Sequence, residues 1–157
     1  MAPIAGLAAP ANGAPSISTR GENLCSRYQS PPKLCTPDPR VTVEETAKRA
    51  QKFFKAFVID GDAKTMFSFI DNVYIQNHPG YQSGPQVIWP LFCNGQPVGN
   101  ATSKSCFDAS TNMSYASYGV VDRWRWVDGC VHEHWDQNET LPSPARCYKP
   151  KFTLGRW

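Results

Sequence analysis

Apolar residues recur every three or four positions between residues 43 and 57, and this spacing predicts one amphipathic helix. Thr42, with Glu45 three residues later, forms a capping-box sequence at its start, and Asp60-Gly61 marks its end. Asp62 is a good N-cap for a short second helix that ends near residue 69. The apolar positions of the first helix are Val43, Ala47, Ala50, Phe54 and Phe57.

After residue 70 the pattern changes to strands. "NVYIQNH" (72–78) predicts a strand that stops at Pro79-Gly80, and "GPQVIWPLF" (84–92) predicts a short helix or a turn. Residues 93–113 are rich in loop-forming residues, whereas residues 114–136 predict a long hairpin. Helices followed by antiparallel strands indicate an α+β domain. A strongly bent sheet around the helix would leave a conical cavity, the usual place for a small ligand.

Asp128-Gly129 fixes the turn of this hairpin, but the turn alone leaves two strand pairings open. A two-residue loop pairs Val127 with Cys130, so that Arg123 lies opposite His134 and Asp122 opposite Trp135. A three-residue loop, with Gly129 in a left-handed bulge, pairs Trp126 with Cys130 and sets Arg123 opposite Glu133 and Asp122 opposite His134. Opposite charges across a strand pair gain roughly a few tenths of a kcal/mol or more. We therefore predict the bulged pairing.

The bulged pairing predicts two different faces, because side chains alternate along a strand. The first face suits solvent or a dimer contact and carries Val121, Arg123, Arg125, Val131, Glu133 and Trp135. The second face mixes aromatic groups with carboxylates and imidazoles and carries Val120, Asp122, Trp124, Trp126, Cys130, His132, His134 and Asp136. Burial among tryptophans raises the pKa of a carboxyl group, which suits general acid–base chemistry near neutral pH. The alternative interpretation is a structural pair of Asp122 and His134 that satisfy one another inside the sheet.

Proline-rich segments flank the domain and divide the chain into three parts. Residues 1–40 form an N-terminal arm, whose first twenty residues are rich in Ala, Pro, Gly and Ser and are expected to be disordered. Residues 41–141 form the domain, and residues 142–157 form a tail that Cys147 ties back. Residues 1–20 have neither a basic start nor a continuous apolar run, so they do not read as an intact signal peptide. We expect that a signal was removed.

Six cysteines and three N-x-S/T sequons favour a secreted protein or a protein of the secretory lumen. The sequons begin at Asn100, Asn112 and Asn138. Six cysteines allow fifteen pairings, among which we predict Cys93–Cys106, with the other four tying both arms to the domain. All six are expected to form disulfides: Cys25, Cys35, Cys93, Cys106, Cys130 and Cys147.

Charge and hydropathy exclude two classes of partner. The net charge is +3 and the sixteen Lys and Arg residues are scattered, so the sequence lacks the clustered basic face that nucleic acid requires. The longest apolar runs are far shorter than a transmembrane helix. We therefore expect neither a nucleic acid nor a membrane as partner.

Two segments of the chain resemble one protein family. "YIQNHPGYQSGPQVIWPLF" (74–92) is similar to the "YIQHNP…G…" segment of SnoaL-like proteins in the NTF2-like superfamily, with Asn77 and His78 exchanged. "VVDRWRWVDGCVHEHWD" (120–136) resembles their terminal hairpin, commonly "vDifRv.dGkivEHWD". The resemblance covers about residues 42–141. It implies an NTF2-like cone, in which a curved antiparallel sheet wraps around a long N-terminal helix, and a homodimer formed through the sheet.

The resemblance also implies an activity and roles for individual residues. Polyketide cyclases of this family close a ring by an intramolecular aldol reaction without a cofactor. Asp136 matches the aspartate that serves as their base, and Asp122 stands where they often have an assisting histidine. We therefore expect cofactor-independent cyclisation, isomerisation or dehydration of a hydrophobic small molecule in secondary metabolism, with His134 as a partner and Tyr74 or His78 as a donor. The expected substrate contacts are Trp124, Trp126, Tyr118 and His132.

Two other interpretations of the same residues stay open. In a non-catalytic carrier or interaction module, the tryptophans form a hydrophobic pocket and the polar groups only orient a ligand. In a metal site, His132, His134 and Asp136 share one face of a strand and His78 adds a ligand. Neighbours on one strand face lie roughly 7 Å apart, so all three do not easily reach one ion, and we predict no metal.

Overall fold

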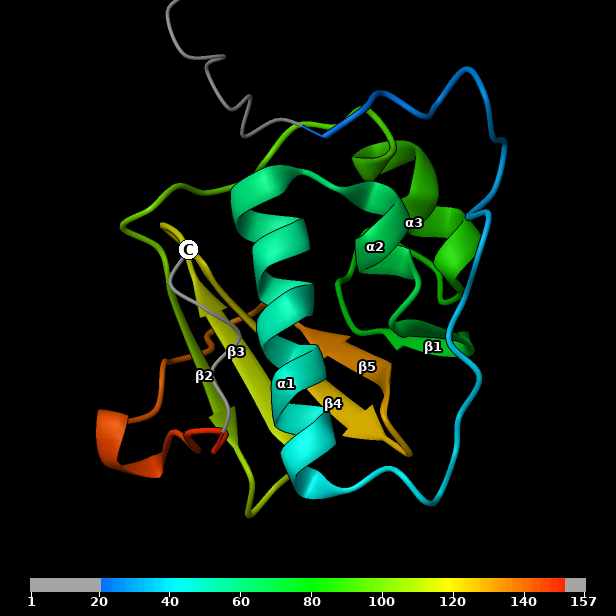
Figure 1. Cartoon of the computed structure of the whole chain (residues 1–157). Helices are drawn as coiled ribbons and strands as arrows, with labels where there is room; N and C mark the ends of the chain where they lie inside the picture. The colour runs from blue at the N-terminus through cyan, green and yellow to red at the C-terminus, as the bar shows by residue number, and fades with distance from the viewer. Residues whose placement is uncertain (1–20, 152–157) are drawn as a thin grey trace, which may run out of the picture.

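In the computed structural model, which describes residues 21–151, a long helix crosses one face of a five-stranded mixed sheet (Figure 1). The strand order is β1-β5-β4-β3-β2; β1 runs parallel to β5, and the other neighbours are antiparallel. The predicted α+β class is confirmed; the disorder predicted for residues 1–20 lies outside the described residues. The elements are α1 (Val43–Phe54), η1 (Lys55–Asp60), α2 (Ala63–Phe67), β1 (Ile70–Gln76), α3 (Pro85–Phe92), β2 (Lys104–Asp108), β3 (Met113–Ser117), β4 (Val121–Val127), β5 (Cys130–Trp135) and η2 (Pro144–Arg146).

Helix α1 begins where the capping sequence predicts. The Thr42 hydroxyl accepts a hydrogen bond from the Glu45 amide at 3.1 Å, which satisfies one of the free amides of the first turn. The chain then continues as the π-helical turn η1 and ends at Gly61, whose φ of +65° is the left-handed conformation that favours glycine. The π-helical geometry of η1 has no signal in the apolar spacing.

The face that α1 buries is shifted slightly from the predicted one. Phe53 is buried, whereas Phe54 is half-buried and Val43 is exposed. Phe53 packs edge-on against Trp124 and Trp126, with ring centroids 5.0 Å and 5.9 Å apart. Burial of one such aromatic side chain contributes about 1.5–3 kcal/mol, so this contact is a main link between the helix and the sheet.

The strands differ from the prediction in number and extent. Strand β1 begins at residue 70, two residues earlier than predicted, and β2 lies inside the segment expected to be loop. The predicted long hairpin is a three-stranded meander, because the chain also turns between β3 and β4. Strand β2 has its buried residues together at one end instead of alternating, and for this reason the pattern missed it.

The pairing of β4 with β5 follows neither predicted register over its whole length. Asp128 and Gly129, with φ of +49° and +81°, form a two-residue turn that pairs Val127 with Cys130. A bulge then shifts the register, so that Arg125 pairs with Glu133. The predicted three-residue loop is therefore wrong: the extra residue belongs to β5, not to the turn.

The bulge corrects the predicted faces at three positions. Cys130, expected on the inner face, pairs with Val127 on the opposite side of the sheet from Trp126 and bonds to Cys35. Val131, expected on the outer face, is fully buried opposite Trp126. His132, expected on the inner face, turns away from the core and bonds to the buried Asp71 of β1. The remaining inner-face residues of β4 and β5 keep their predicted direction, since Asp122, Trp124 and His134 are buried.

Three disulfides tie the two arms to the domain. Cys25 pairs with Cys93, Cys35 with Cys130, and Cys106 with Cys147, so the predicted Cys93–Cys106 pair is wrong. The N-terminal arm runs along α3 and β1, whereas the C-terminal segment lies beside β2 at the other edge of the sheet (Figure 1). Each arm is therefore bonded to cysteines on the side of the domain along which it runs.

No helix within residues 21–151 combines the length and the apolar character that crossing a bilayer requires.

Peptide mapping of the non-reduced protein should recover the Cys25–Cys93, Cys35–Cys130 and Cys106–Cys147 pairs. Their sequence separations are 68, 95 and 41 residues, and in the chain-entropy model loops of this length contribute about 4–5 kcal/mol each. Replacing Cys35 and Cys130 together by serine should lower the free energy of unfolding by several kcal/mol in a denaturant titration. Recovery of a Cys93–Cys106 peptide from native protein would contradict the structure.

Candidate active site

A cavity of about 180 Å³ lies between the sheet, the helices α2 and α3 and the turn η1. Its two sides differ in chemistry. The side formed by the helices is apolar, with Phe57, Met66, Ile88, Leu91 and Phe92. The side formed by β1, β4 and β5 and their flanking residues carries most of the polar groups: Tyr74, Gln76, His78, Tyr118, Asp122, His134 and Asp136.

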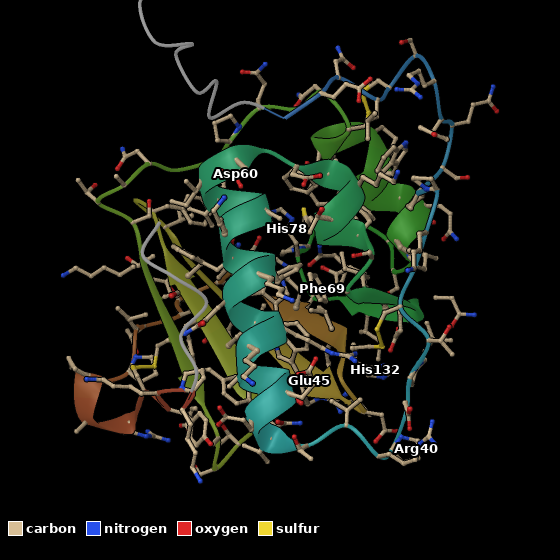
Figure 2. All side chains as sticks on the ribbon, viewed as in Figure 1. Arg40, Glu45, Asp60, Phe69, His78 and His132 are labelled. Carbon is tan, nitrogen blue, oxygen red and sulfur yellow. A yellow bond between two sulfur atoms is a disulfide. The ribbon has the colours of Figure 1, made fainter. Side chains whose placement is uncertain are left out.

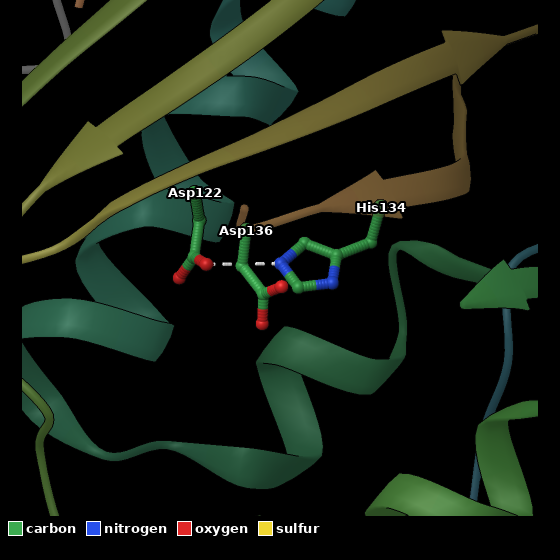
Figure 3. A group of neighbouring side chains, drawn as sticks. All are labelled: Asp122, His134 and Asp136. Carbon is green, nitrogen blue, oxygen red and sulfur yellow. Dashed lines mark hydrogen bonds and ion pairs between the residues drawn. The ribbon is translucent and has the colours of Figure 1, made fainter. Parts of the chain in front are cut away.

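Asp122 and His134 form a buried pair on neighbouring strands. Atom Oδ1 of Asp122 lies 3.0 Å from Nε2 of His134 (Figure 3), and only 4% and 8% of the two residues are exposed. The Tyr118 hydroxyl donates to the other carboxylate oxygen of Asp122. The indole ring of Trp124 stacks on the imidazole with a centroid distance of 5.4 Å, so water has little access to this pair.

Gln76 of β1 determines which nitrogen of His134 carries a proton. The Gln76 amide is oriented by two bonds: its Oε1 accepts from the His78 amide, and its Nε2 donates to the Tyr74 hydroxyl. Oε1 lies 2.6 Å from Nδ1 of His134. Because an amide oxygen only accepts hydrogen bonds, Nδ1 must be the donor and carry hydrogen.

Atoms Nε2 of His134 and Oδ1 of Asp122, 3.0 Å apart, are too close for two bare acceptors, so one proton lies between them. If the proton is on nitrogen, the pair is an imidazolium and a carboxylate; if it is on oxygen, both groups are neutral. In both states the net charge of the pair is zero. The pair therefore holds one proton that it can transfer to a molecule in the cavity.

Asp136 lies next to this pair but is more open to the cavity. Asp136 directly follows the last residue of β5, and its side chain is 21% exposed. One of its oxygens lies 3.9 Å from Nε2 of His78. The Gly80 amide donates to Nδ1 of His78, so in the neutral imidazole Nε2 carries the hydrogen and is directed toward Asp136.

Two of the three tyrosines that line the cavity, Tyr74 and Tyr118, stay protonated. Burial, together with the negative charges of Asp122 and Asp136, raises the pKa of Tyr74 and of Tyr118. Both phenols therefore act as hydrogen-bond donors over the pH range in which proteins function. Tyr118 already donates to Asp122, whereas the Tyr74 oxygen accepts from Gln76 and can still donate its own hydrogen.

The structure brings together most of the residues that the sequence predicts for the site. The five predicted catalytic residues line the cavity: Asp136, Asp122, His134, His78 and Tyr74. Trp124 and Tyr118 line it as well. Asn77 points to the other side and donates to the His134 carbonyl and to Glu133, as the alternation along β1 predicts.

Two predicted substrate contacts do not reach the cavity. Trp126 lies in the core, where its indole NH donates to the Ser114 hydroxyl and its ring packs on Phe53. His132 lies near the N-terminal arm, away from His78 (Figure 2). Neither residue lines the cavity, because the bulge in β5 turns His132 away from it and the helix α1 covers Trp126.

Gln76 also lines the cavity but was not predicted as a site residue. Its position on β1 between Tyr74 and His78, on the same strand face, is the sequence signal that indicates it.

Within residues 21–151, the side chains that could jointly hold a metal ion are Asp122, His134 and Asp136, whose ligand atoms lie within 4.8 Å of one another. Two ligands of one zinc ion, each about 2.0–2.2 Å from the metal, are separated by no more than about twice that distance. The group would have to contract slightly and exchange the Asp122–His134 hydrogen bond for metal bonds. The set with His132 that the sequence suggested is wrong, because His132 is bonded to Asp71.

No family model, curated protein or solved structure matches the chain. The interpretation of the site therefore rests on its geometry.

Replacing Gln76 by Leu should free the tautomer of His134. Loss of the acceptor for a buried imidazole NH should cost about 1–3 kcal/mol of unfolding free energy. In nitrogen-15 NMR of the imidazole groups, the wild-type protein should show hydrogen on Nδ1 of His134, and Q76L should show a mixture of tautomers. Val73→Ala, an exposed position on the same strand, is the matched control and should leave the signal unchanged. A bare Nδ1 in the wild-type protein would contradict the assignment.

Proposed function

We propose that the cavity is the active site of a cofactor-independent enzyme that isomerises, dehydrates or cyclises a hydrophobic carbonyl compound by proton transfer. The observation that carries the proposal is the position of the Asp136 carboxylate, open to the cavity and beside the Asp122–His134 pair with its single proton. Two groups with different protonation states in one pocket are what acid–base catalysis requires. The proposal includes the NTF2-like cone and the SnoaL-like family, which the sequence resemblance supports.

In the proposed mechanism Asp136 is the base. It takes a proton from the carbon next to a substrate carbonyl, and the electron pair of the C–H bond moves to the carbonyl oxygen as an enolate. Tyr74 and Nε2–H of His78 are the donors near the cavity that stabilise this oxygen. Such donors, fixed before the reaction, stabilise the charge that develops in the transition state.

The second half of the proposed reaction returns a proton. In an isomerisation, protonated Asp136 delivers its proton to another carbon of the enolate. In a dehydration, the Asp122–His134 pair gives its proton to the leaving hydroxyl group, which departs as water. Gln76 and Tyr118 hold the pair in place through Nδ1 of His134 and the carboxylate of Asp122.

A non-catalytic binding module is the second candidate. Within residues 21–151 no buried side-chain nitrogen or oxygen lacks a hydrogen-bond partner, which is also what a purely structural polar network would show. In this candidate the apolar wall supplies the affinity and the polar wall orients the ligand. The two candidates differ in one readout, because only the enzyme exchanges substrate protons with solvent.

Replacing Asp136 by Asn should abolish proton exchange without unfolding the protein. Hydrogen–deuterium exchange into a panel of enolisable ketones, followed by mass spectrometry, detects the base without knowledge of the substrate. A general base contributes about 10²–10⁴-fold, and D136N should lose that factor while its melting temperature stays close to wild type. Asp128→Asn in the exposed hairpin turn is the matched control. Unchanged exchange in D136N would remove Asp136 as the base, and ketone binding without exchange by the wild type would favour the binding module.

We also propose a secreted or secretory-lumen location and a homodimer through the outer face of the sheet. The three disulfides are consistent with an extracellular location.

On the outer face of the sheet, where the homodimer is proposed to form, the charges are already paired, with Arg125 on Glu133 and Arg123 on Glu139. A face with paired charges can be covered with less loss of hydration than one with single charges.

The sequons should be modified at two positions when the protein is made in a glycosylating secretory host. Asn100 and Asn138 are exposed. The Asn112 amide instead donates to the Trp126 carbonyl at 2.7 Å, and the hydroxyl of Ser114 in the same sequon is buried. Intact mass before and after N-glycosidase treatment should show glycans on Asn100 and Asn138 and none on Asn112. A glycan on Asn112 would contradict this assignment.

A further inference from the structure

We infer that the occupant of the cavity is an uncharged molecule with a single six-membered ring and a carbonyl group on one side. The inference rests on the proposed function and narrows its substrate. Three features of the described cavity carry it: the volume, the distribution of polar groups and a lining without Lys or Arg.

The volume admits one ring. At about 180 Å³ the cavity is slightly larger than the apolar cavity of about 150 Å³ that accommodates benzene. It is smaller than the roughly 300–1,000 Å³ that drug-sized ligands occupy. A compound with three or four fused rings does not fit this space.

The wall that limits the volume is fixed at both ends. Helix α3 contributes Ile88, Leu91 and Phe92 to the cavity. At its start the Gly84 amide donates to the Tyr74 carbonyl at 2.9 Å, and just after its end the Cys25–Cys93 disulfide ties it to the N-terminal arm. The helix therefore cannot move outward to admit a larger molecule without breaking one of these links.

The polar groups of the cavity lie on one side. A ring that packs on Phe57, Ile88 and Phe92 of the apolar wall has its other edge near Tyr74, His78 and Asp136. An oxygen on that edge can accept from the phenol or from the imidazole. A carbon next to the carbonyl then faces the Asp136 carboxylate.

The charge of the cavity selects an uncharged occupant. None of the described residues that line it is Lys or Arg. The Asp122–His134 pair has zero net charge in both of its states. An ionised Asp136 beside a neutral His78 therefore leaves the site negative, and this charge repels carboxylate and phosphate groups. An ammonium group would pair with Asp136 and reduce its basicity, so a cationic molecule would oppose the proposed chemistry.

Four probes of related shape test the inference by binding alone, without turnover. Acetophenone has one ring and no charge, benzoate carries a negative charge, benzylamine carries a positive charge, and anthrone has three fused rings. Binding is followed by NMR of the Trp124 indole and the Met66 methyl group, which both line the cavity. Acetophenone should shift these signals at millimolar concentration, benzoate should bind at least tenfold more weakly, and anthrone should not bind. Benzylamine should bind by pairing with Asp136, so that its binding is lost in D136N.

A pair of variants on α3 tests the size limit. Ile88→Ala enlarges the cavity and should allow anthrone to shift the Trp124 signal. Val87→Ala, the exposed neighbour on the same helix, should not. The four-probe comparison on the wild-type protein tests the inference independently if I88A does not fold.

The outcomes separate this inference from the proposed function. If acetophenone binds selectively but no ketone exchanges its protons, the identity of the occupant is supported and the enzyme proposal fails. If the wild-type protein binds anthrone or benzoate as well as acetophenone, the inference is overturned even where proton exchange is observed.

Discussion

The β-bulge in β5 sets the direction of every later side chain of that strand, and the candidate site depends on it. Between the turn and the bulge, Trp126 pairs with Val131; beyond the bulge, Trp124 pairs with His134. Without the extra residue, the alternation of the strand would direct Glu133 into the core and His134 to the outer surface. A single inserted residue therefore decides whether the sheet buries the Glu133 carboxylate or the His134 imidazole.

The position of His134 in turn links the two edges of the site. Gln76 of β1 is its partner in the parallel strand pair, and Asp122 of β4 lies on its other side. One neighbouring strand thus fixes the tautomer of the His134 imidazole through Gln76, and the other provides Asp122, which shares a proton with it. Because these contacts come from backbone pairing, the network is held by the sheet and does not depend on flexible loops.

The sequence predicts which residues of the hairpin face inward beyond the bulge, but not where the bulge lies. One extra residue anywhere between Asp128 and His134 gives the same inner face beyond it, so Asp122, Trp124, His134 and Asp136 are placed well from alternation alone. The energy of an Arg–Glu pair cannot locate the bulge, because Arg123 and Arg125 are on the same face and both offer a partner for Glu133. The structure selects Arg125, and Arg123 bonds to Glu139 instead.

Other differences between prediction and structure have the same origin. A local sequence pattern does not show which distant segments of the chain lie side by side. The capping sequence, the end of the first helix and the α+β class follow from local signals and are confirmed. The Cys93–Cys106 pair was predicted from closeness in sequence, whereas the path of each arm along the domain decides the pairing. The edge strand β2 lacks alternation and was missed.

None of the three native disulfides joins two cysteines that are consecutive in the sequence. During synthesis Cys25 and Cys35 leave the ribosome before the other four, and among the six each is then the nearest available partner of the other. A bridge between these two is the first that the six cysteines can form, and it is non-native. Once formed, it has to be reshuffled after Cys93 and Cys130 appear. Thiol–disulfide exchange of this kind takes seconds to hours, depending on the oxidant and the isomerase. Oxidation that outpaces isomerisation would leave the N-terminal arm closed on itself and the helix α3 without its anchor.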